Sequence, residues 1–349
     1  MPSRPVGSRF TRPNIAITVG DVAGVGPELS LIAAMDEHVT RRCRPILVGP
    51  QSALMRVGDA LGLTVPPTIH VESLDNEEGK PATGPVLIDH GSVDAAKLRP
   101  GEFSSETGRA SFESVVFAIE QTLAGRFDAI VTGPIQKEAW HLAGTGYLGH
   151  TELLADQTQT KNYCMMLSGP TCSTVLVTIH EPLAQAVESL SVDAIERAIR
   201  LGGTAMQTRY GRPPRIAVLG LNPHAGEGGL LSRGEEENLI LPAIESTCRW
   251  VSREQLAWEI RGPVPPDTAF TSAMRDATDV HVCMYHDQGL IPLKALSFDD
   301  AVNVTLGLPI TRTSVDHGTA MDLAWKGIAS KNSMLAAIEM AIDLCDAAQ

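Results

Sequence analysis

Aromatic residues, long apolar runs and paired cysteines are scarce or absent in this sequence. Phe, Trp and Tyr make up 4% of the residues and hydrophobic residues 43%, so the core must consist mainly of Ala, Val, Leu and Ile. No apolar run reaches the roughly 18 residues of a membrane-spanning helix, so no membrane partner is expected. The six cysteines form no CxxC pair, which is typical of buried, reduced thiols and favours a cytoplasmic location.

Positive charge is also scarce. The chain has 28 Lys and Arg against 41 Asp and Glu, a net charge of −13, which argues against a nucleic-acid partner. Any phosphate ligand must therefore be met by a local cationic pocket. The 349 residues suit two domains or one large α/β unit. Residues 1–13 are basic and proline-rich without a following apolar segment, so they are expected to form a flexible leader and not a signal peptide.

Short β-branched runs alternate with helical patterns along the chain, which predicts a layered α/β fold with a largely parallel sheet. A polar, Gly- and Pro-containing segment at 73–85 is a candidate linker. The clearest strands are expected at 14–20, 44–49, 127–133, 173–180, 215–220 and 279–286, and the clearest helices at 107–125, 191–208 and 332–347.

Three histidines lie at or just beyond the ends of predicted strands. His180 ends "STVLVTIH", His286 ends "DVHVCMYH", and His224 follows "RIAVLG" in the loop "LNPHAGEGG". In open α/β sheets ligands collect at the carboxyl ends of strands, so these imidazoles could together bind a divalent metal. The alternative is three unrelated loop histidines. The glycines after His224 could cradle a phosphate, or could simply form a tight turn.

Other polar segments have two interpretations each. In "MYHDQGLIPLK", Asp287 could orient His286 and Lys294 could bind an anion, or the segment could be a helix start with a solvated lysine. "GDVAGVGPE" (20–28) and the segment 309–327 could be nucleotide loops or ordinary turns and helix starts. Asp267, after two prolines in "GPVPPDT", could be a catalytic carboxylate or a turn former.

Six motifs in order resemble the 4-hydroxythreonine-4-phosphate dehydrogenases, the PdxA family, over about residues 14–330. They are "ITVGDVAGVGPE", "GHTELLA", "LNPHAGEGG", "GPVPPDT", "MYHDQGLIPLK" and "VNVTLGLPITRTSVDHGTAMDLA". The resemblance implies two α/β/α domains with mixed, largely parallel sheets and an interdomain cleft, like the isocitrate and isopropylmalate dehydrogenases. The first domain would comprise 14–133 plus 306–349, and the second, 134–305, would form a homodimer whose active sites are shared between subunits.

The resemblance also implies an activity. It is the metal-dependent, NAD-linked oxidation of a secondary alcohol followed by decarboxylation, here of 4-phosphohydroxy-L-threonine to 3-amino-2-oxopropyl phosphate. The alternative substrates are 4-phospho-D-threonate and 4-phospho-D-erythronate, which would give dihydroxyacetone phosphate. "KNYCMML" and "GPVPPDT" look somewhat more like this second branch. Two remoter alternatives are a non-catalytic phosphate-binding module and an α/β acyl transferase.

The family's site residues are carried over to matching positions. The metal, Zn²⁺ or else Mg²⁺, Mn²⁺ or Co²⁺, would be held by His180, His224 and His286. The substrate would contact His150, Thr151, Lys294, Asn303 and Arg312, and NAD would contact His317, Gly318, Thr319 and Asp322. Asp267 or Lys294 would be the general acid or base. The sequence departs from the family at Val22, where proline is usual, and at Trp325, where glycine is common.

Overall fold

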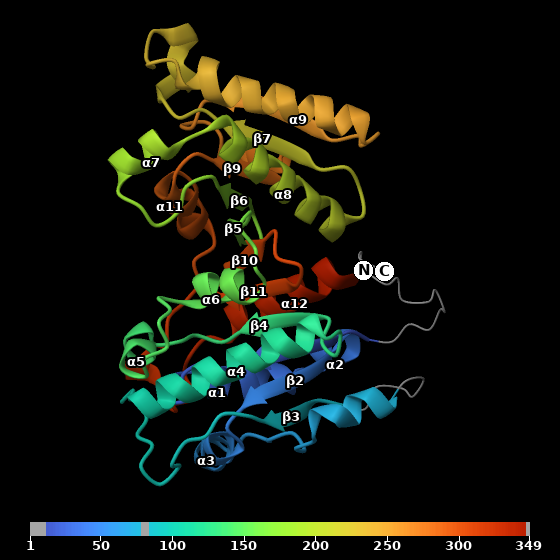
Figure 1. The fold of residues 1–349 in the computed structure, drawn as a ribbon, viewed down its shortest axis with the longest axis vertical. Coiled ribbons are helices and arrows are strands. Elements are labelled where there is room, and N and C mark those ends of the chain that lie inside the picture. The colour runs from blue at the N-terminus through green and yellow to red at the C-terminus, as the bar shows by residue number, and fades with distance from the viewer. Residues whose placement is uncertain (1–11, 78–83, 347–349) are drawn as a thin grey trace.

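The computed structural model describes residues 12–77 and 84–346. The predicted leader therefore lies mostly outside the described residues, as does 78–83 of the predicted linker, whereas Val71–Glu77 forms a 3-10 helix, η1. One sheet of 11 strands runs through the described part of the elongated molecule, in the order β3-β2-β1-β4-β11-β10-β5-β6-β9-β7-β8 (Figure 1). The strands are β1 Asn14–Thr18, β2 Arg44–Gly49, β3 Val86–Asp89, β4 Ala129–Thr132, β5 Cys164–Ser168, β6 Ser173–Leu176, β7 Arg215–Leu219, β8 Glu259–Val264, β9 Val280–Cys283, β10 Val302–Leu306 and β11 Thr311–Val315.

The sheet has two parallel halves joined by antiparallel strands. Strands β3, β2, β1, β4 and β11 pair in parallel, and so do β6, β9, β7 and β8. The pairs β11–β10, β10–β5 and β5–β6 between them are antiparallel. The largely parallel α/β fold is thus confirmed. The two sheets that the resemblance implied are continuous here, because β10 pairs with both β11 and β5.

Helices cover both faces of the sheet, so its inner parallel strands are buried almost throughout, whereas no residue of the edge strand β8 is buried. The helices are α1 Gly26–Ala34, α2 Glu37–Arg42, α3 Gln51–Leu61, α4 Ser105–Leu123, α5 Lys137–Leu142, α6 His150–Gln157, α7 Leu183–Ser189, α8 Val192–Tyr210, α9 Leu241–Arg253, α10 Ser272–Asp276, α11 His286–Leu296 and α12 Asn332–Asp346. Helix α4 begins at a capping box between Ser104 and Thr107, and α8 ends at Gly211 with φ 62°. Among the described helices, none is long and apolar enough to cross a membrane.

Two predicted strands end earlier than expected. The predicted strand 173–180 ends at Leu176, and 279–286 ends at Cys283, so that His286 begins α11 and does not end a strand. The chain turns there because the side chain of Gln288 accepts a hydrogen bond from the Met284 amide at 2.7 Å and donates one to the Gly220 carbonyl at 2.8 Å. This non-local contact has no counterpart in the local sequence pattern.

The segment after β4 packs on the first half of the sheet. Trp140 of α5, with Leu153 and Leu154 of α6, belongs to the same buried cluster as Ile46 and Ile130 of β2 and β4. The predicted domain boundary at residue 134 assigns these two helices to the second domain. Helix α6 lies near β10 and β11, and α5 lies beside α4 of the first half (Figure 1).

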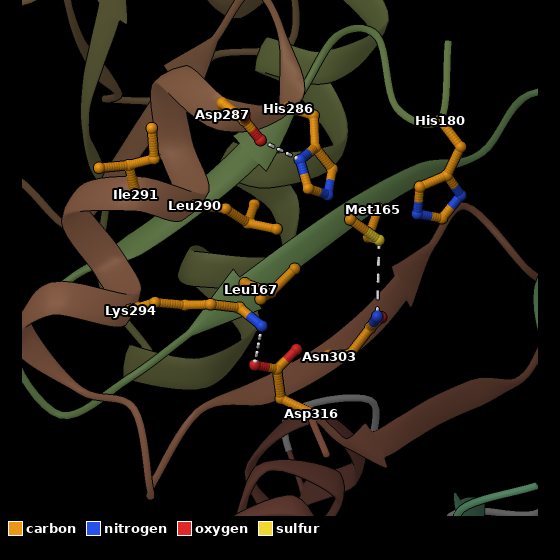
Figure 2. A pocket seen from close by; sticks show the side chains of 10 residues that line it. All are labelled: Met165, Leu167, His180, His286, Asp287, Leu290, Ile291, Lys294, Asn303 and Asp316. Atoms are coloured by element: carbon orange, nitrogen blue, oxygen red, sulfur yellow. Dashed lines mark hydrogen bonds and ion pairs between the residues drawn. The ribbon is translucent and has the colours of Figure 1, made fainter. Parts of the chain in front are cut away.

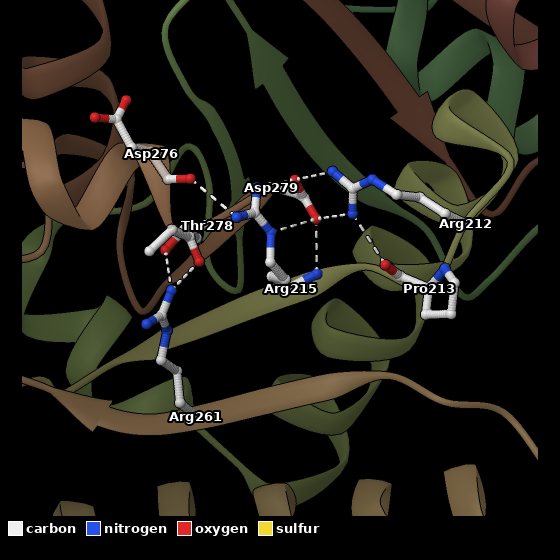
Figure 3. Close-up of polar contacts among 8 residues, drawn as sticks. Arg212, Pro213, Arg215, Arg261, Asp276, Thr278 and Asp279 are labelled. Carbon is white, nitrogen blue, oxygen red and sulfur yellow. Dashed lines mark hydrogen bonds and ion pairs between the residues drawn. The ribbon is translucent and has the colours of Figure 1, made fainter.

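A charged cluster fixes the opposite edge of the second half, where β7 and β9 begin (Figure 3). Asp279, with its side chain 4% exposed, accepts hydrogen bonds at 2.8 Å from the guanidinium groups of Arg212 and Arg215. The Arg215 backbone amide also donates to Asp279, at 2.8 Å. The carboxylate thus ties the starts of two neighbouring strands together, at the edge away from His180 and His286.

Candidate active site

A cavity of about 580 Å³ lies against the face of the sheet where the two halves meet (Figure 2). Its floor is formed by β5 and β10, which pair so that Leu167 lies opposite Asn303. Helix α11 forms one side. The lining residues are Met165, Leu167, His180, His286, Asp287, Leu290, Ile291, Lys294, Asn303 and Asp316. Four predicted site residues therefore share one cavity: His180, His286, Lys294 and Asn303.

His180 and His286 form an imidazole pair in this cavity. Their ring centroids are 5.7 Å apart, because they follow the neighbouring parallel strands β6 and β9. The Nδ1 atom of His286 is 2.7 Å from Asp287 Oδ1, which leaves its Nε2 atom for a ligand. Burial, then the charges of His286 and Lys137, lower the pKa of His180, so its imidazole is held neutral, the form that binds metals.

His224 does not join this pair within one chain. It is exposed on the 3-10 loop η2, Pro223–Gly229, beyond β7. Within the described residues no group of three His, Cys, Asp or Glu side chains is arranged to hold a metal. Asp267 is likewise exposed, beyond the neighbouring strand β8, and does not line the cavity. One chain thus brings together two of the three predicted ligands, and leaves His224 and Asp267 at the outer edge of the sheet.

The loop that bears His224 is held in an uncommon backbone conformation. His224, Ala225 and Glu227 have φ values of 54°, 52° and 45°, in the left-handed region that favours glycine. Glu236, only 1% exposed, clamps the loop by accepting hydrogen bonds from the amides of Leu221 and Asn222 at 2.9 and 2.8 Å. Glu236 thus fixes the entry to the loop at Leu221 and Asn222, before His224 and the glycines.

Arg312 is a buried cation without a carboxylate partner in the described structure. It is 3% exposed and donates to Thr132 Oγ1 at 2.7 Å from Nη2 and to Thr305 Oγ1 at 3.0 Å from Nη1. Burial alone lowers its pKa to about 9. A buried charge that meets only hydroxyl groups is costly, and an anionic ligand would offset that cost.

His150 lies close to Arg312. Its Nε2 atom is buried and has no hydrogen-bond partner among the described residues, and its ring packs on Trp140 with centroids 5.5 Å apart. Burial, then the charges of Arg312 and Lys137, lower the pKa of His150 well below its usual value. His150 and Thr151 also begin helix α6, whose first amides favour anions. These residues suit an anionic group.

Lys294 is paired with a carboxylate that lies in the polar segment 309–327 and was assigned no role from the sequence. Its Nζ atom is 2.9 Å from Asp316 Oδ2, just after β11 (Figure 2). Asn303 Nδ2 contacts Met165 Sδ at 3.5 Å, and its Oδ1 atom is buried without a partner in the described residues. Lys294 therefore faces the cavity with its charge offset by Asp316, and the Oδ1 atom of Asn303 is available there to accept a hydrogen bond.

The two expected nucleotide segments pack against each other. The Val25 amide donates to the Thr319 carbonyl at 3.0 Å, and Thr319 Oγ1 donates to Gln136 Oε1 at 3.0 Å. A side chain at Gly318 would meet open space, and Asp322 is exposed in η4, Met321–Leu323. His317 is near them, with Nδ1 2.9 Å from the Gly318 carbonyl. These four residues thus lie together, outside the cavity lining.

The two departures from the family pattern contact each other. Trp325 has φ 57°, and its Nε1 atom donates to the Val22 carbonyl at 3.1 Å. The guanidinium of Arg56 lies 5.2 Å from the centroid of the Trp325 ring. Trp325 therefore packs over the glycine turn at 20–28, where the family's usual proline in place of Val22 would stiffen the backbone.

Three residues with a place in the site were missed or given no role at the sequence level. Asp316 lies within the polar segment 309–327 but was given no role, Lys137 follows the strand 127–133, and Glu236 is one of three consecutive glutamates. Position after a strand could have drawn attention to Lys137 and Asp316. Nothing local distinguishes Glu236 from Glu235 and Glu237.

Comparison with known proteins adds independent evidence. A family model described as pyridoxal phosphate biosynthetic protein PdxA matches residues 41–341. The chain is 46% identical over 333 residues to the 4-hydroxythreonine-4-phosphate dehydrogenase of Desulfosudis oleivorans, covering 95% of this chain and 96% of that protein. It is 40% identical over 333 residues to the D-threonate 4-phosphate dehydrogenase of Salmonella typhimurium, covering 95% and 98%. The crystal structure of 4-hydroxythreonine-4-phosphate dehydrogenase from Klebsiella pneumoniae aligns with a TM-score of 0.81 at 38% identity, covering 97% and 99%.

These matches define a dehydrogenase, an oxidoreductase acting on a CH–OH group, with a largely parallel α/β fold. The chain belongs to the PdxA family. The resemblance drawn from the six motifs is confirmed. The names of the relatives favour an enzyme over the non-catalytic phosphate-binding module and over the acyl transferase.

Proposed function

We propose that this chain is a metal-dependent, NAD-linked dehydrogenase. It oxidises the secondary alcohol of a 4-phosphorylated hydroxy acid, and the resulting keto acid loses CO₂. The observation that carries this proposal is the buried Arg312, which lacks a carboxylate partner in the described structure and lies beside the buried, unpartnered Nε2 atom of His150. Burying the Arg312 guanidinium without a carboxylate costs free energy, and a bound anion would offset that cost.

The histidine pair fits a divalent metal. Two imidazoles at 5.7 Å between centroids, one of them oriented by Asp287, suit Zn²⁺ and leave positions open for further ligands. His180 and His286 would hold the ion, with His224 of a second copy as third ligand, because the rigid loop of each chain carries its own His224 outward. A homodimer with shared sites follows. When bound, the metal supplies a Lewis acid at the alcohol oxygen.

The remaining residues bind different parts of the substrate. Arg312, His150 and Thr151 bind the phosphate. Lys294 and Asn303, which face the cavity, bind the carboxylate and hydroxyl end, and Lys294 is placed to deliver a proton to the carbon that loses CO₂. Asp267 is a candidate base only from a partner subunit, since it lies away from the cavity of its own chain. NAD is assigned to His317, Gly318, Thr319 and Asp322.

The preferred substrate is 4-phosphohydroxy-L-threonine, and the alternatives are 4-phospho-D-threonate and 4-phospho-D-erythronate. Relatives at 46% and 40% identity are named for the first and for a threonate substrate. The test is NADH formation by the metal-loaded protein with each compound in turn. Highest kcat/KM with phosphohydroxythreonine supports the preferred assignment. A higher kcat/KM with the threonate or the erythronate would assign the chain to the second branch of the family. Absence of NADH formation with all three compounds would contradict the proposal.

A further inference from the structure

Lys137 is an exposed cation at the start of α5 with no assigned function. No ion pair or hydrogen bond of its side chain occurs among the described residues, although the chain carries 41 acidic groups. The exposed Glu152 also points toward Gly149, where an added methyl group would lie 3.4 Å from Glu152 Oε2, but no ion pair joins Glu152 to Lys137 among the described residues. An unpaired lysine on a chain of charge −13 is a candidate for binding an anion.

Helix geometry turns Lys137 toward the start of α6. Trp140 lies three residues further along α5, on the same face, and its ring packs against His150 at 5.5 Å between centroids. A methyl group added at Gly149, the residue that precedes α6, would lie 3.6 Å from Lys137 Cε. The lysine side chain therefore passes over the first turn of α6, which begins with His150 and Thr151.

The electrostatic surroundings agree with this position. The charge of Lys137 is one cause, after burial, of the lowered pKa values of both His150 and His180. Lys137 is thus close to the predicted phosphate site and to the predicted metal site at once. Arg312 lies near His150 as well, but it is buried and meets two threonine hydroxyls.

We infer that Lys137 binds the phosphate group of the substrate, opposite Arg312, and makes the site selective for phosphorylated substrates. A phosphate monoester carries about 1.5 to 2 negative charges near neutral pH, more than one guanidinium can offset. Lys294 does not supply the rest, because it is assigned to the carboxylate and hydroxyl end of the substrate and is paired with Asp316 at 2.9 Å. Lys137 and the amides of the first turn of α6 complete the anion site. This inference rests on the proposed function, since it assumes a phosphorylated substrate.

The test compares Lys137→Met with Lys137→Arg and with Lys161→Met, which removes an exposed lysine between α6 and β5. Inorganic phosphate is titrated into each full-length protein by calorimetry, so binding is measured without turnover. Kinetics follow with a phosphorylated substrate and with its dephosphorylated counterpart. One charge-assisted hydrogen bond corresponds to about tenfold in affinity.

The inference predicts that Lys137→Met raises the phosphate Kd and the substrate KM about tenfold, leaves kcat within about threefold, and does not change kcat/KM for the dephosphorylated compound. Lys137→Arg should restore most of the affinity, and Lys161→Met should match the wild type. Equal phosphate affinity in Lys137→Met and wild type overturns the inference, even if the wild type oxidises the substrate. If the wild type oxidises none of the compounds, the proposed function fails, while the phosphate titration still decides whether Lys137 binds phosphate.

Discussion

Lys294 of α11 and Asp316, just beyond β11, form an ion pair across the cavity, with 2.9 Å between Nζ and Oδ2 (Figure 2). The two residues come from different halves of the sheet, because α11 follows β9 and β11 pairs with β4. Asp316 also precedes His317, the first residue of the segment assigned to NAD. The pair thus connects the substrate lysine to the expected cofactor segment.

Asp316→Asn should act on activity more than on stability. The ammonium of Lys294 would lose the partner that holds it over the cavity, so kcat/KM should fall about tenfold. Unfolding free energy should change by less than about 1 kcal/mol, since partly exposed ion pairs contribute little. Steady-state kinetics and thermal unfolding measure the two effects. The control is Asp299→Asn, which changes an exposed aspartate shortly after α11. An equal kinetic loss in this control would contradict the role of Asp316.

Asp287→Asn should weaken metal binding without unfolding the protein. Asp287 Oδ1 lies 2.7 Å from His286 Nδ1 and holds the ring so that Nε2 faces a ligand. Losing such a partner costs about 10- to 100-fold in metal affinity. Competition with a chromophoric chelator measures the Zn²⁺ affinity directly. His180→Ala should lower the Zn²⁺ affinity more than Asp287→Asn does. If His180→Ala bound Zn²⁺ as tightly as the wild type, the metal site could not lie in this cavity.

Glu236→Gln should loosen the loop that carries His224. Oε1 of the buried carboxylate accepts the amides of Leu221 and Asn222, and Oε2 accepts a hydrogen bond from Asn222 Nδ2 at 3.0 Å, which the NH₂ group of a glutamine could not accept. Amide hydrogen exchange over residues 221–231 should therefore become faster, and Zn²⁺ affinity should fall toward that of His224→Ala. Glu237→Gln is the matched control on the next residue. Unchanged exchange in Glu236→Gln would show that the clamp does not hold the loop.

Asp279→Asn should destabilise the second half of the sheet by about 2 to 3 kcal/mol, because two guanidinium groups lose their shared carboxylate. Desolvation opposes but does not overcome the hydrogen bonds of Arg212 and Arg215, which hold the pKa of Asp279 well below its usual range. A depressed folded-state pKa stabilises the protein above the unfolded pKa of about 3.9, and this contribution is lost as the pH falls toward the folded pKa.

The difference between Asp279→Asn and wild type should therefore be constant from pH 7 to about pH 5 and shrink below about pH 4. Urea unfolding at a series of pH values measures it. Glu254→Gln, which removes an exposed pair with Arg253 at 3.4 Å, should cost less than about 1 kcal/mol. A constant difference down to the lowest pH would contradict the account of Asp279.

Local patterns predicted the elements well and their assembly poorly. The strand 44–49 was predicted to the residue, because a short apolar run, Ile46 to Val48, that ends at a glycine is a local signal. The end of β9 was not, because it depends on the contacts of Gln288 with Met284 and Gly220. The histidines were recognised as strand-end residues, but the order β6-β9-β7 places β9 beside both other strands, and the course of η2 beyond β7 keeps His224 out of the pair.

The anion site shows the same limit. Arg312 and His150 were carried over from a family resemblance, and no spacing in the chain indicates that they are close together. They meet because β11 pairs with β4, which brings Arg312 beside Thr132, and because α5 and α6 fold back onto the first half of the sheet. Long-range pairing of this kind is set by the whole core and not by any one segment.

The most direct test of the account is to strip the protein of metal, add NAD⁺ and 4-phosphohydroxy-L-threonine, and follow NADH and CO₂ before and after adding Zn²⁺. We expect neither product before the addition and equal molar amounts of both after it. NADH formed at the full rate without metal would contradict the assignment of His180 and His286. NADH without CO₂ would contradict the decarboxylation, and silence in the metal-loaded protein with this substrate, the threonate and the erythronate would contradict the proposed function.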